Sequence, residues 1–425
     1  MFVRRPSLTR RQMLSLLAAA PAHASAPLSG DDDEFLEDLS QRAFLYFWER
    51  ASSQTGLVLD RARNQEGEEK RNVGSSAATG FGLTALCIAA QRRWMPREAL
   101  RARALATLRF YAETSVHEHG WFYHFVDAST GRRAWNCELS SINTALLLAG
   151  ALTAREYFRD PEITRLADAI YRRIDFRWML NGHETLLALG WYPEKGFIPN
   201  RWNHYCELMI LYLLAIGSPS SPVPPESWYA WKRPAMTYAG RKYISDADPL
   251  FVHQYSHAWV DFRNRRESRG VRADWFLNSV EATMAHRQFC IDLGQTSFPG
   301  CYSEDLWGIT ASDSAKGYVA WGGPPLHKAI DGSIVPCAAG GSLMFEPHLC
   351  VKALRAMKDR FGSRIWNRYG FSDAFHPLNG WVDLDVIGID LGITLISAKN
   401  ARTGGVWRWF MRNKAIAGAL AQVGL

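Results

Sequence analysis

Three carboxylate residues lie in strongly apolar stretches of the sequence, where a charged side chain is costly unless it is paired or used. Glu138 precedes Leu-Ser-Ser-Ile-Asn-Thr-Ala-Leu, Glu207 precedes Leu-Met-Ile-Leu-Tyr, and Asp390 stands in Val-Ile-Gly-Ile-Asp-Leu-Gly-Ile. We expect each acid at a helix N-terminus, where the helix dipole favours a carboxylate. That structural role would explain any one of them alone, although it explains Glu207 least well. The three together indicate a functional site, because the N-termini of inner helices can converge on one cavity.

Paired carboxyl groups at a cavity are what the hydrolysis of a glycosidic bond requires. A neutral carboxylic acid protonates the leaving oxygen, and a second carboxylate activates water or attacks the sugar. Apolar surroundings raise the pKa of a carboxyl group because they disfavour its charged form, and this suits the acid. These residues therefore favour an enzyme that hydrolyses carbohydrates.

Aromatic residues are abundant, and the chain has 17 Trp. Trp is amphipathic and is seldom fully buried, so an excess suggests a binding surface as well as a core. Six Trp fall between the predicted helices, where core packing explains them less well: Trp121, Trp135, Trp191, Trp202, Trp307 and Trp321. We expect some of them to offer flat apolar faces to sugar rings.

Other combinations of residues point less clearly to chemistry. His253 and His257 have the i, i+4 spacing of a metal pair, but no HExxH pattern and no obvious third ligand accompany them, so we expect substrate hydrogen bonding or a structural role and no metal. Asp313 ends the stretch Trp-Gly-Ile-Thr-Ala-Ser-Asp and could bind a sugar hydroxyl or close a turn. The sequence has no nucleophile elbow, phosphate-binding loop or dinucleotide fingerprint, and we expect no cofactor.

Apolar residues at helical spacing recur through most of the chain. After a first helix that begins near Phe35, the predicted helices span 77–93, 96–114, 138–158, 161–179, 205–216, 226–233, 256–265, 273–293, 346–361, 390–401 and 403–412. Several, such as 144–151 and 208–216, are apolar on every side and must be buried all round. An all-α (α/α)6 toroid, in which outer helices surround inner ones, meets that demand. An open solenoid is the alternative, but no sequence period supports it.

Two stretches are predicted to be irregular. Residues 217–225 contain four prolines and should form a rigid connection. Residues 295–342 are rich in Gly, Pro, Ser and aromatic residues, and a loop of that length in a compact domain is usually functional. We expect this long segment to lie over the cleft of the toroid.

The first 26 residues have the features of a twin-arginine export signal. Arg10 and Arg11 are followed by a short apolar run and then by small residues, and cleavage after Ala24 or Ala26 would fit. An ordinary basic tail is the alternative. We therefore predict a signal peptide at 1–26, a single catalytic domain at 27–425, and a periplasmic or secreted protein.

Charge and composition narrow the class of partner. Without residues 1–26 the chain has 45 basic and 42 acidic residues, a net charge of +3, which argues against a nucleic-acid partner. No later apolar run reaches the length of a membrane span, so we expect a soluble chain and, by default, a monomer. The seven scattered Cys form no CxxC pair and are predicted to be mostly buried free thiols.

Six short segments, in matching order, resemble one known family. They are 76–86 (Ser-Ala-Ala-Thr-Gly-Phe-Gly-Leu-Thr-Ala-Leu), 122–125 (Phe-Tyr-His-Phe), 138–141 (Glu-Leu-Ser-Ser), 253–257 (His-Gln-Tyr-Ser-His), 307–313 (Trp-Gly-Ile-Thr-Ala-Ser-Asp) and 388–390 (Gly-Ile-Asp). These segments are similar to the glycoamylase-like domain, which includes the bacterial endo-β-1,2-glucanases of glycoside hydrolase family 144. The resemblance extends from about residue 76 to residue 407.

The resemblance implies an (α/α)6 toroid that hydrolyses β-1,2-glucan with inversion at the anomeric carbon and without a metal. By position, Glu207 would be the general acid, acting directly or through a substrate hydroxyl, Asp390 the base that directs water, and Glu138 a residue that tunes the site or binds sugar. The predicted substrate-binding residues are Trp121, Tyr123, His124, Trp202, His253, Tyr255, Trp307 and Asp313. One departure is Asn143, where family members often have Asp, which could change activity or specificity.

Two other functions remain open from the sequence. Helical toroids also host polysaccharide lyases and unsaturated-uronate hydrolases, and lyases favour a Tyr or His base, a role that His124, Tyr255 or His257 could fill. A catalytically impaired carbohydrate-binding protein is the other alternative, with Asn143 as the trace of lost chemistry. All of these readings share a poly- or oligosaccharide partner.

Overall fold

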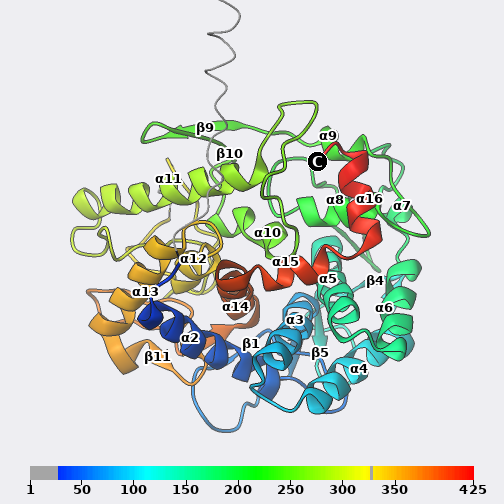
Figure 1. The fold of residues 1–425 in the computed structure, drawn as a ribbon, viewed down its shortest axis with the longest axis horizontal. Helices are drawn as coiled ribbons and strands as arrows, with labels where there is room; N and C mark the ends of the chain where they lie inside the picture. The colour runs from blue at the N-terminus through cyan, green and yellow to red at the C-terminus, as the bar shows by residue number, and fades with distance from the viewer. Residues whose placement is uncertain (1–26, 326–328) are drawn as a thin grey trace, which may run out of the picture.

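The computed structural model describes residues 27–325 and 329–425, and in this part the chain is mostly helical (Figure 1). The predicted signal peptide, residues 1–26, lies outside the described residues and stays a prediction. Within the described residues, every helix is too short or too polar to cross a bilayer.

The helices form an outer and an inner set (Figure 1). Amphipathic helices lie on the outside, and helices that are buried on almost every side lie between them. The outer set includes α2 (Gly30–Glu49), α4 (Arg97–Glu113), α6 (Pro161–Arg173), α11 (Trp275–Gln295) and α13 (Pro347–Phe361). The inner set includes α3 (Ser76–Arg92), α5 (Ser141–Phe158), α8 (Met209–Ile216), α10 (Tyr255–Trp259), α12 (Pro336–Gly341) and α14 (Gly388–Thr403). Shorter helices are α7 (Phe176–Met179), α9 (Ser227–Ala230), α15 (Gly405–Phe410) and α16 (Lys414–Gln422), with 3-10 turns η1 (Leu250–His253) and η2 (Gly362–Arg364).

The inner helices α3 and α5 pack backbone against backbone. Gly80 of α3 faces Gly150 of α5, and a Cβ atom on either residue would overlap main-chain atoms of the other helix. Neither helix has an exposed stripe at this crossing, because residues 76–90 and 143–154 are buried. Small residues therefore set how closely the two inner helices approach.

Gly150→Ala is expected to destabilise the protein by about 3 kcal/mol, because the added methyl group must push two packed helices apart. Gly418→Ala is the matched control: Gly418 is an exposed glycine in α16 with no atom near the position of a Cβ. There the substitution should be neutral or stabilise by about 0.5–1 kcal/mol through helix propensity. Urea unfolding of both variants measures the difference, and equal midpoints would contradict this view of the α3–α5 contact.

Short strands precede three of the inner helices without a gap. Strand β2 (Val73–Ser75) leads into α3, β6 (Leu139–Ser140) into α5, and β13 (Asp385–Ile387) into α14. They pair antiparallel with β5 (Phe125–Asp127), β7 (Gly190–Tyr192) and β1 (Arg61–Arg63), respectively. The remaining strands are β3 (His117–Glu118), β4 (Trp121–Phe122), β8 (Gly196–Phe197), β9 (Ala235–Tyr238), β10 (Arg241–Ile244), β11 (Trp366–Asn367) and β12 (Gly370–Phe371).

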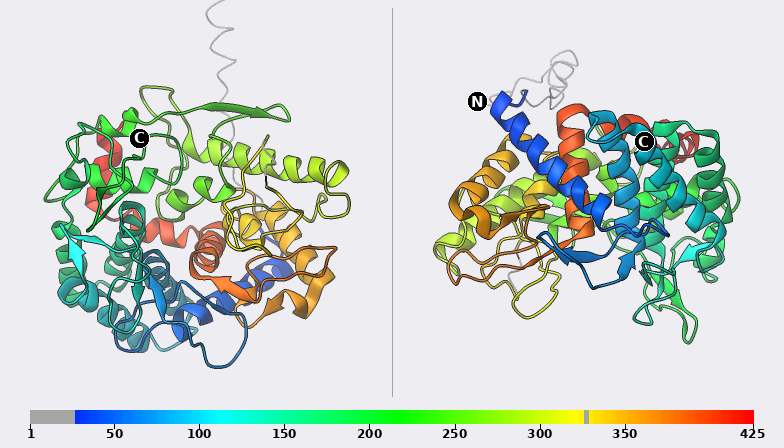
Figure 2. Two further views of the ribbon diagram at one scale, coloured as in Figure 1. Left: turned by 180° about the vertical axis from the view of Figure 1, so that it is seen from behind. Right: turned by 90° about the horizontal axis from the view of Figure 1, so that it is seen from below.

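These strand-to-helix junctions bring the N-termini of α3, α5 and α14 to one end of the molecule, where strands and loops gather (Figure 2, right). Backbone hydrogen bonds join the junctions to one another. Gly388 N donates to Asp60 O (2.7 Å), Ser76 N to His124 O (3.1 Å), and His124 N to Glu138 O (3.0 Å). Two of the residues in these bonds, Asp60 and His124, line the candidate site.

Two of the predicted helix starts are wrong. Helix α5 begins at Ser141, because Leu139 and Ser140 pair with β7 and Ser140 is the N-cap, so Glu138 lies outside the helix. Helix α8 begins at Met209, and Glu207 lies in the preceding turn. The N-cap residue of α8, Leu208, makes no side-chain hydrogen bond to the first turn of the helix. Instead, Ser256 Oγ accepts a hydrogen bond from Ile210 N (3.0 Å).

Predictions about irregular segments and cysteines are mostly confirmed. Residues 295–342 are irregular apart from the short helix α12, as far as they are described. All seven cysteines are free, and all but Cys206 are buried.

Candidate active site

A cavity of about 420 Å³ lies at the end where the helix N-termini meet. Its lining comes from segments that are distant in the sequence, including β1, the loop after β4, α5, the turn before α8, and the long segment 295–342. The lining residues are Asp60, Arg61, Ala77, His124, Phe125, Ile142, Asn143, Leu146, Glu207, Phe251, Tyr255, Tyr318, Ile387 and Ile389. The wall is thus largely apolar, with a few charged and polar groups, as is typical of a small-molecule site.

Glu207 is the candidate acid at this cavity. The turn that carries it is fixed by Ser256, whose Oγ donates a hydrogen bond to Glu207 O (2.7 Å). Burial raises the pKa of the Glu207 carboxyl to about 7, and the nearby Asp248 charge acts in the same direction. At neutral pH a substantial fraction of Glu207 is therefore protonated, which is the state a general acid needs.

Asp390 lies in the first turn of α14, as predicted, and is 7% exposed. It lines a small neighbouring cavity of about 20 Å³ together with Cys337 and Asp373. Ile387 lines both this cavity and the main one, so the two are adjacent. Burial raises the pKa of Asp390 above its ordinary value, while hydrogen bonds from Asp373 and Cys337 act against that rise.

Tyr255 lines the main cavity and senses the charges of both acids. Burial raises the pKa of its hydroxyl well above the ordinary value, and the charges of Asp390 and Glu207 both add to the rise. Both carboxyl groups therefore lie within electrostatic range of one side chain that lines the main cavity. The geometric link between Glu207 and Asp390 is Ile387, which lines both the main cavity and the small one beside it.

Glu138 reaches the cavity through His124. His124 lines the cavity, and its Nδ1 lies 3.0 Å from Glu138 Oε1. Burial disfavours the Glu138 carboxylate, but the hydrogen bond and charge of His124 outweigh it, so the pKa of Glu138 is lower than usual. Glu138 is therefore an ionised partner that orients His124, and it is poorly suited to donate a proton.

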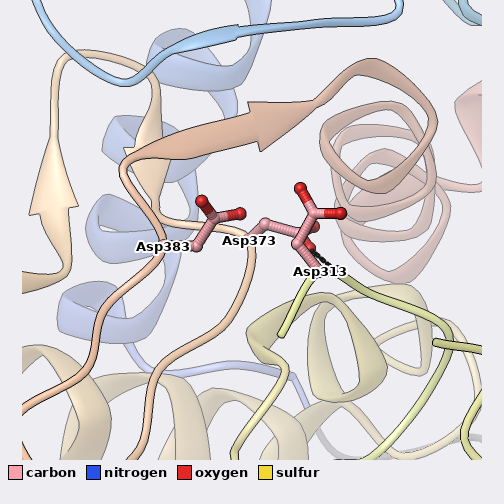
Figure 3. Close-up of side chains that lie close together, drawn as sticks. All are labelled: Asp313, Asp373 and Asp383. Atoms are coloured by element: carbon pink, nitrogen blue, oxygen red, sulfur yellow. Dashed lines mark hydrogen bonds between the residues drawn. The ribbon is translucent and has the colours of Figure 1, made fainter. Parts of the chain in front are cut away.

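A second group of acids lies beside Asp390. Asp313, Asp373 and Asp383 each offer a carboxylate oxygen within 4.8 Å of the others (Figure 3). Asp313 N donates to Asp373 Oδ2 (2.8 Å), and Arg61 Nη1 lies 2.5 Å from Asp313 Oδ2. Burial raises the pKa values of Asp373 and Asp383. Carboxylate oxygens at this spacing could hold a hard cation such as Ca²⁺, or they can share protons with one another.

Three predicted substrate-binding residues lie in the core and need correction. Trp121 and Trp307 are fully buried, and Trp121 Nε1 donates to Asp175 O (2.9 Å). His253 is 2% exposed, and its Nδ1 lies 2.9 Å from the Tyr205 hydroxyl. Burial lowers the pKa of His253 to about 3. The sequence places these residues in loops, but helices that are distant in the chain pack over them. Their side chains therefore stabilise the fold.

The other predicted substrate-binding residues lie at or near the cavity. His124 and Tyr255 line it directly. Trp202 Nε1 donates to Ser141 Oγ (2.7 Å) and so supports the start of α5. Tyr123 is mostly buried under the Arg133 guanidinium, and Asp313 contacts the cavity residue Arg61. Of these residues, only His124 and Tyr255 are therefore placed to contact a ligand in the main cavity.

Sequence reasoning missed several cavity residues. Asp60 and Arg61 form an ion pair in the cavity wall (Nε to Oδ2, 3.0 Å), and Phe125 and Tyr318 supply aromatic surface. The signal for Asp60 was present, because an acid directly follows the apolar run Leu57-Val58-Leu59. Asp60 directly precedes β1 and Asp373 lies between β12 and β13, so neither stands in the apolar helical pattern that indicates Glu207 and Asp390.

Comparison with known proteins agrees with this fold. The sequence model of the Glycoamylase family matches residues 199–414, half of the chain, and includes both Glu207 and Asp390. The chain belongs to the Glycoamylase family.

Individual relatives have named activities. The chain is 27% identical, over 92% of its length, to an exo-β-1,2-glucooligosaccharide sophorohydrolase (non-reducing end) from Parabacteroides distasonis, of which it spans 58%. Its structure matches an endo-β-1,2-glucanase from Chitinophaga pinensis in complex with sophorotriose and glucose, with a TM-score of 0.85, 26% identity, and coverage of 93% of this chain and 98% of that one. It also matches a β-1,2-glucanase from Parabacteroides distasonis, with a TM-score of 0.85, 25% identity, and coverage of 94% and 61%.

Proposed function

We propose that this protein is a glycoside hydrolase that cleaves β-1,2-glucan by an inverting mechanism. The observation that carries the proposal is the Glu207 carboxyl, whose pKa burial raises to about 7, at a cavity that shares the lining residue Ile387 with the small cavity of Asp390. Glycoside hydrolysis needs such a pair, one acid that is neutral at working pH and one carboxylate. The choice of glucan rests on the three relatives described above, each of which is named for activity on β-1,2-linked glucose chains.

In this mechanism Glu207 gives its proton to the glycosidic oxygen, either directly or through a substrate hydroxyl. The bond from that oxygen to the anomeric carbon breaks as water attacks the carbon from the opposite face. Asp390 takes the proton that the water loses. His124, held by Glu138, and the Tyr255 hydroxyl line the cavity and can hydrogen-bond the sugar that occupies it.

The fold proposed for this chemistry is the (α/α)6 toroid, with inner helices that present their N-termini to the substrate. The likeness to β-1,2-glucanase structures over most of the chain supports it. We also propose export through the predicted signal at residues 1–26, which would bring the enzyme to extracellular or periplasmic glucan. Endo and exo relatives are about equally similar to the chain.

Incubating the mature protein with linear β-1,2-glucan and separating the products by chromatography tests the proposal. We expect short β-1,2-linked oligosaccharides, and their length distribution over time will distinguish endo from exo cleavage. Absence of products from β-1,2-glucan and from a panel of other β-glucans would overturn the proposal.

Glu138→Gln is expected to lower kcat/KM by about ten-fold, far less than loss of the acid, because Glu138 orients His124 and is not the proton donor. Steady-state kinetics on β-1,2-glucan measure the effect. His124→Asn should cause a similar loss, and the double variant should add little, since the two side chains act as a unit. A loss as large as that of Glu207→Gln would contradict this supporting role.

A polysaccharide lyase remains the second candidate, because the cavity also holds a Tyr, a His and the cationic Arg61. A lyase needs a Tyr or His base and a cation that neutralises a uronate. Its product carries a new carbon–carbon double bond, which ultraviolet absorbance detects when the protein is mixed with uronate polysaccharides. We expect no such absorbance, since the buried acid Glu207 would have no task in that reaction.

A further inference from the structure

Exposed aromatic side chains are rare in the described residues, and they occur next to the active-site cavity. Trp135 is 64% exposed and Tyr318 is 54% exposed, whereas the other large exposed hydrophobic side chains there are aliphatic. Tyr318 lines the cavity itself. Of the six Trp predicted to lie in loops, Trp135 is the one that the core does not cover.

The loop that carries Trp135 is held rigidly. Arg133 Nε donates to Cys137 O (2.6 Å), Arg133 Nη2 donates to Asn136 O (2.7 Å), and Arg133 Nη1 lies 2.5 Å from Glu194 Oε1. One guanidinium thus ties both ends of the loop tip to a neighbouring strand region.

The backbone at this tip has an uncommon conformation. Trp135 and Asn136 both have positive φ angles, 54° and 48°. A bulky residue rarely adopts this left-handed conformation, and such strain persists only where the surroundings impose it, often at binding sites. The strain and the Arg133 bonds together fix the backbone from which the Trp135 side chain projects.

The Trp135 ring continues the aromatic surface of the cavity. Its centroid lies 4.9 Å from that of Phe125, and the Phe125 ring stacks on His124 at 3.8 Å. Phe125 and His124 both line the cavity. A continuous row of rings therefore runs from the cavity wall at His124 to solvent at Trp135.

We propose that Trp135 is a stacking platform for a glucosyl unit of the substrate that lies outside the cavity. This inference rests on the proposed function and extends it, because it assigns a subsite that only longer chains reach. The apolar face of a pyranose ring packs on the flat indole, and the rigid loop reduces the ordering cost of binding. Trp135 would then favour polymeric β-1,2-glucan over the shortest oligosaccharides.

Calorimetry with linear β-1,2-glucan tests the platform on a Glu207→Gln background, in which binding is measured without turnover. Trp135→Ala should weaken binding of long chains by about ten-fold, and Trp135→Phe, which keeps an aromatic face, should retain most of the affinity. Leu277→Ala is the control, since Leu277 is exposed on helix α11 and lies outside the cavity lining. It should bind like the background protein.

Substrates of different lengths distinguish a binding role of Trp135 from a structural one. In the active enzyme, Trp135→Ala should raise KM for polymer and leave kcat/KM for the shortest cleaved oligosaccharide unchanged. If Trp135→Ala binds polymer as tightly as the protein that keeps the ring, the platform is overturned and the proposed function is not. The same holds if Trp135→Ala loses affinity equally for substrates of every length and also has a lower melting temperature. Binding of glucan without hydrolysis by the active enzyme would overturn the proposed function alone, and absence of binding by the background protein would overturn both.

Discussion

Glu207→Gln is expected to lower kcat on β-1,2-glucan by about 10²–10⁴-fold, the range that a positioned general acid contributes. The amide keeps the size of the side chain but cannot give a proton to the leaving oxygen. Reducing-end release measures the loss. Glu226→Gln is the matched control, because Glu226 is an exposed glutamate that precedes α9 and should be replaceable without effect.

The same residue sets the alkaline limb of the pH profile. Because the pKa of Glu207 is about 7, activity should fall as the pH rises through that value and the carboxyl loses its proton. In Glu207→Gln the residual activity should lack this limb. A variant with full activity, or a wild-type profile with no loss above neutral pH, would remove Glu207 from the acid role.

Glu207→Gln should change stability in the opposite direction to activity. The folded protein raises the pKa of Glu207 from the ordinary 4.5 to about 7, so the stability that comes from the neutral carboxyl is complete below 4.5 and lost as the pH rises through 7. The amide never ionises. At about pH 8 the free energy of unfolding of Glu207→Gln should therefore exceed that of wild type by an amount on the order of 1–3 kcal/mol, and its melting temperature should be higher. Below pH 4.5 the two melting temperatures should coincide.

Asp390→Asn is expected to cause a loss of similar size, about 10²–10⁴-fold in kcat, because the attacking water would have no base. The protein should stay folded, since a neutral amide is no costlier in this buried place than a carboxylate whose pKa burial has raised. Steady-state kinetics with circular dichroism as a folding check measure both effects. Asp359→Asn, at an exposed position in α13, is the control.

Asp60 is the structural rival to Asp390 as the base, because it lines the main cavity directly. Its carboxylate is held in an ion pair with Arg61 and so has a structural role in the cavity wall. Asp60→Asn should therefore lose clearly less activity than Asp390→Asn. If the order of the two losses is reversed, Asp60 is the base and Asp390 supports it.

The sequence was sufficient to predict those parts of the site that depend on local pattern. Acids next to fully apolar runs predicted Glu207, which lines the main cavity, and Asp390, which lines the small cavity beside it. Helices that are apolar on every side were predicted to be inner helices, and α3, α5 and α8 are buried in that way.

The rest depends on contacts between segments that are distant in the chain. The start of α8 is fixed by Ser256, and the two-residue strand β6 delays α5 because it pairs with β7. Asp60 reaches the site because β1 pairs with β13, more than 300 residues later. Trp121 and Trp307 are in loops by local pattern, but neighbouring elements cover them completely. The spacing of residues within one segment does not predict these long-range contacts.

The anomeric form of the first product tests the central claim most directly. Proton NMR of a fresh mixture of the protein and linear β-1,2-glucan resolves the newly formed reducing ends before they equilibrate. Proton donation by Glu207 with direct attack of water through Asp390 predicts that the α-anomer appears first. A first product in the β-form, or an unchanged glucan, would contradict the inverting glucanase described above.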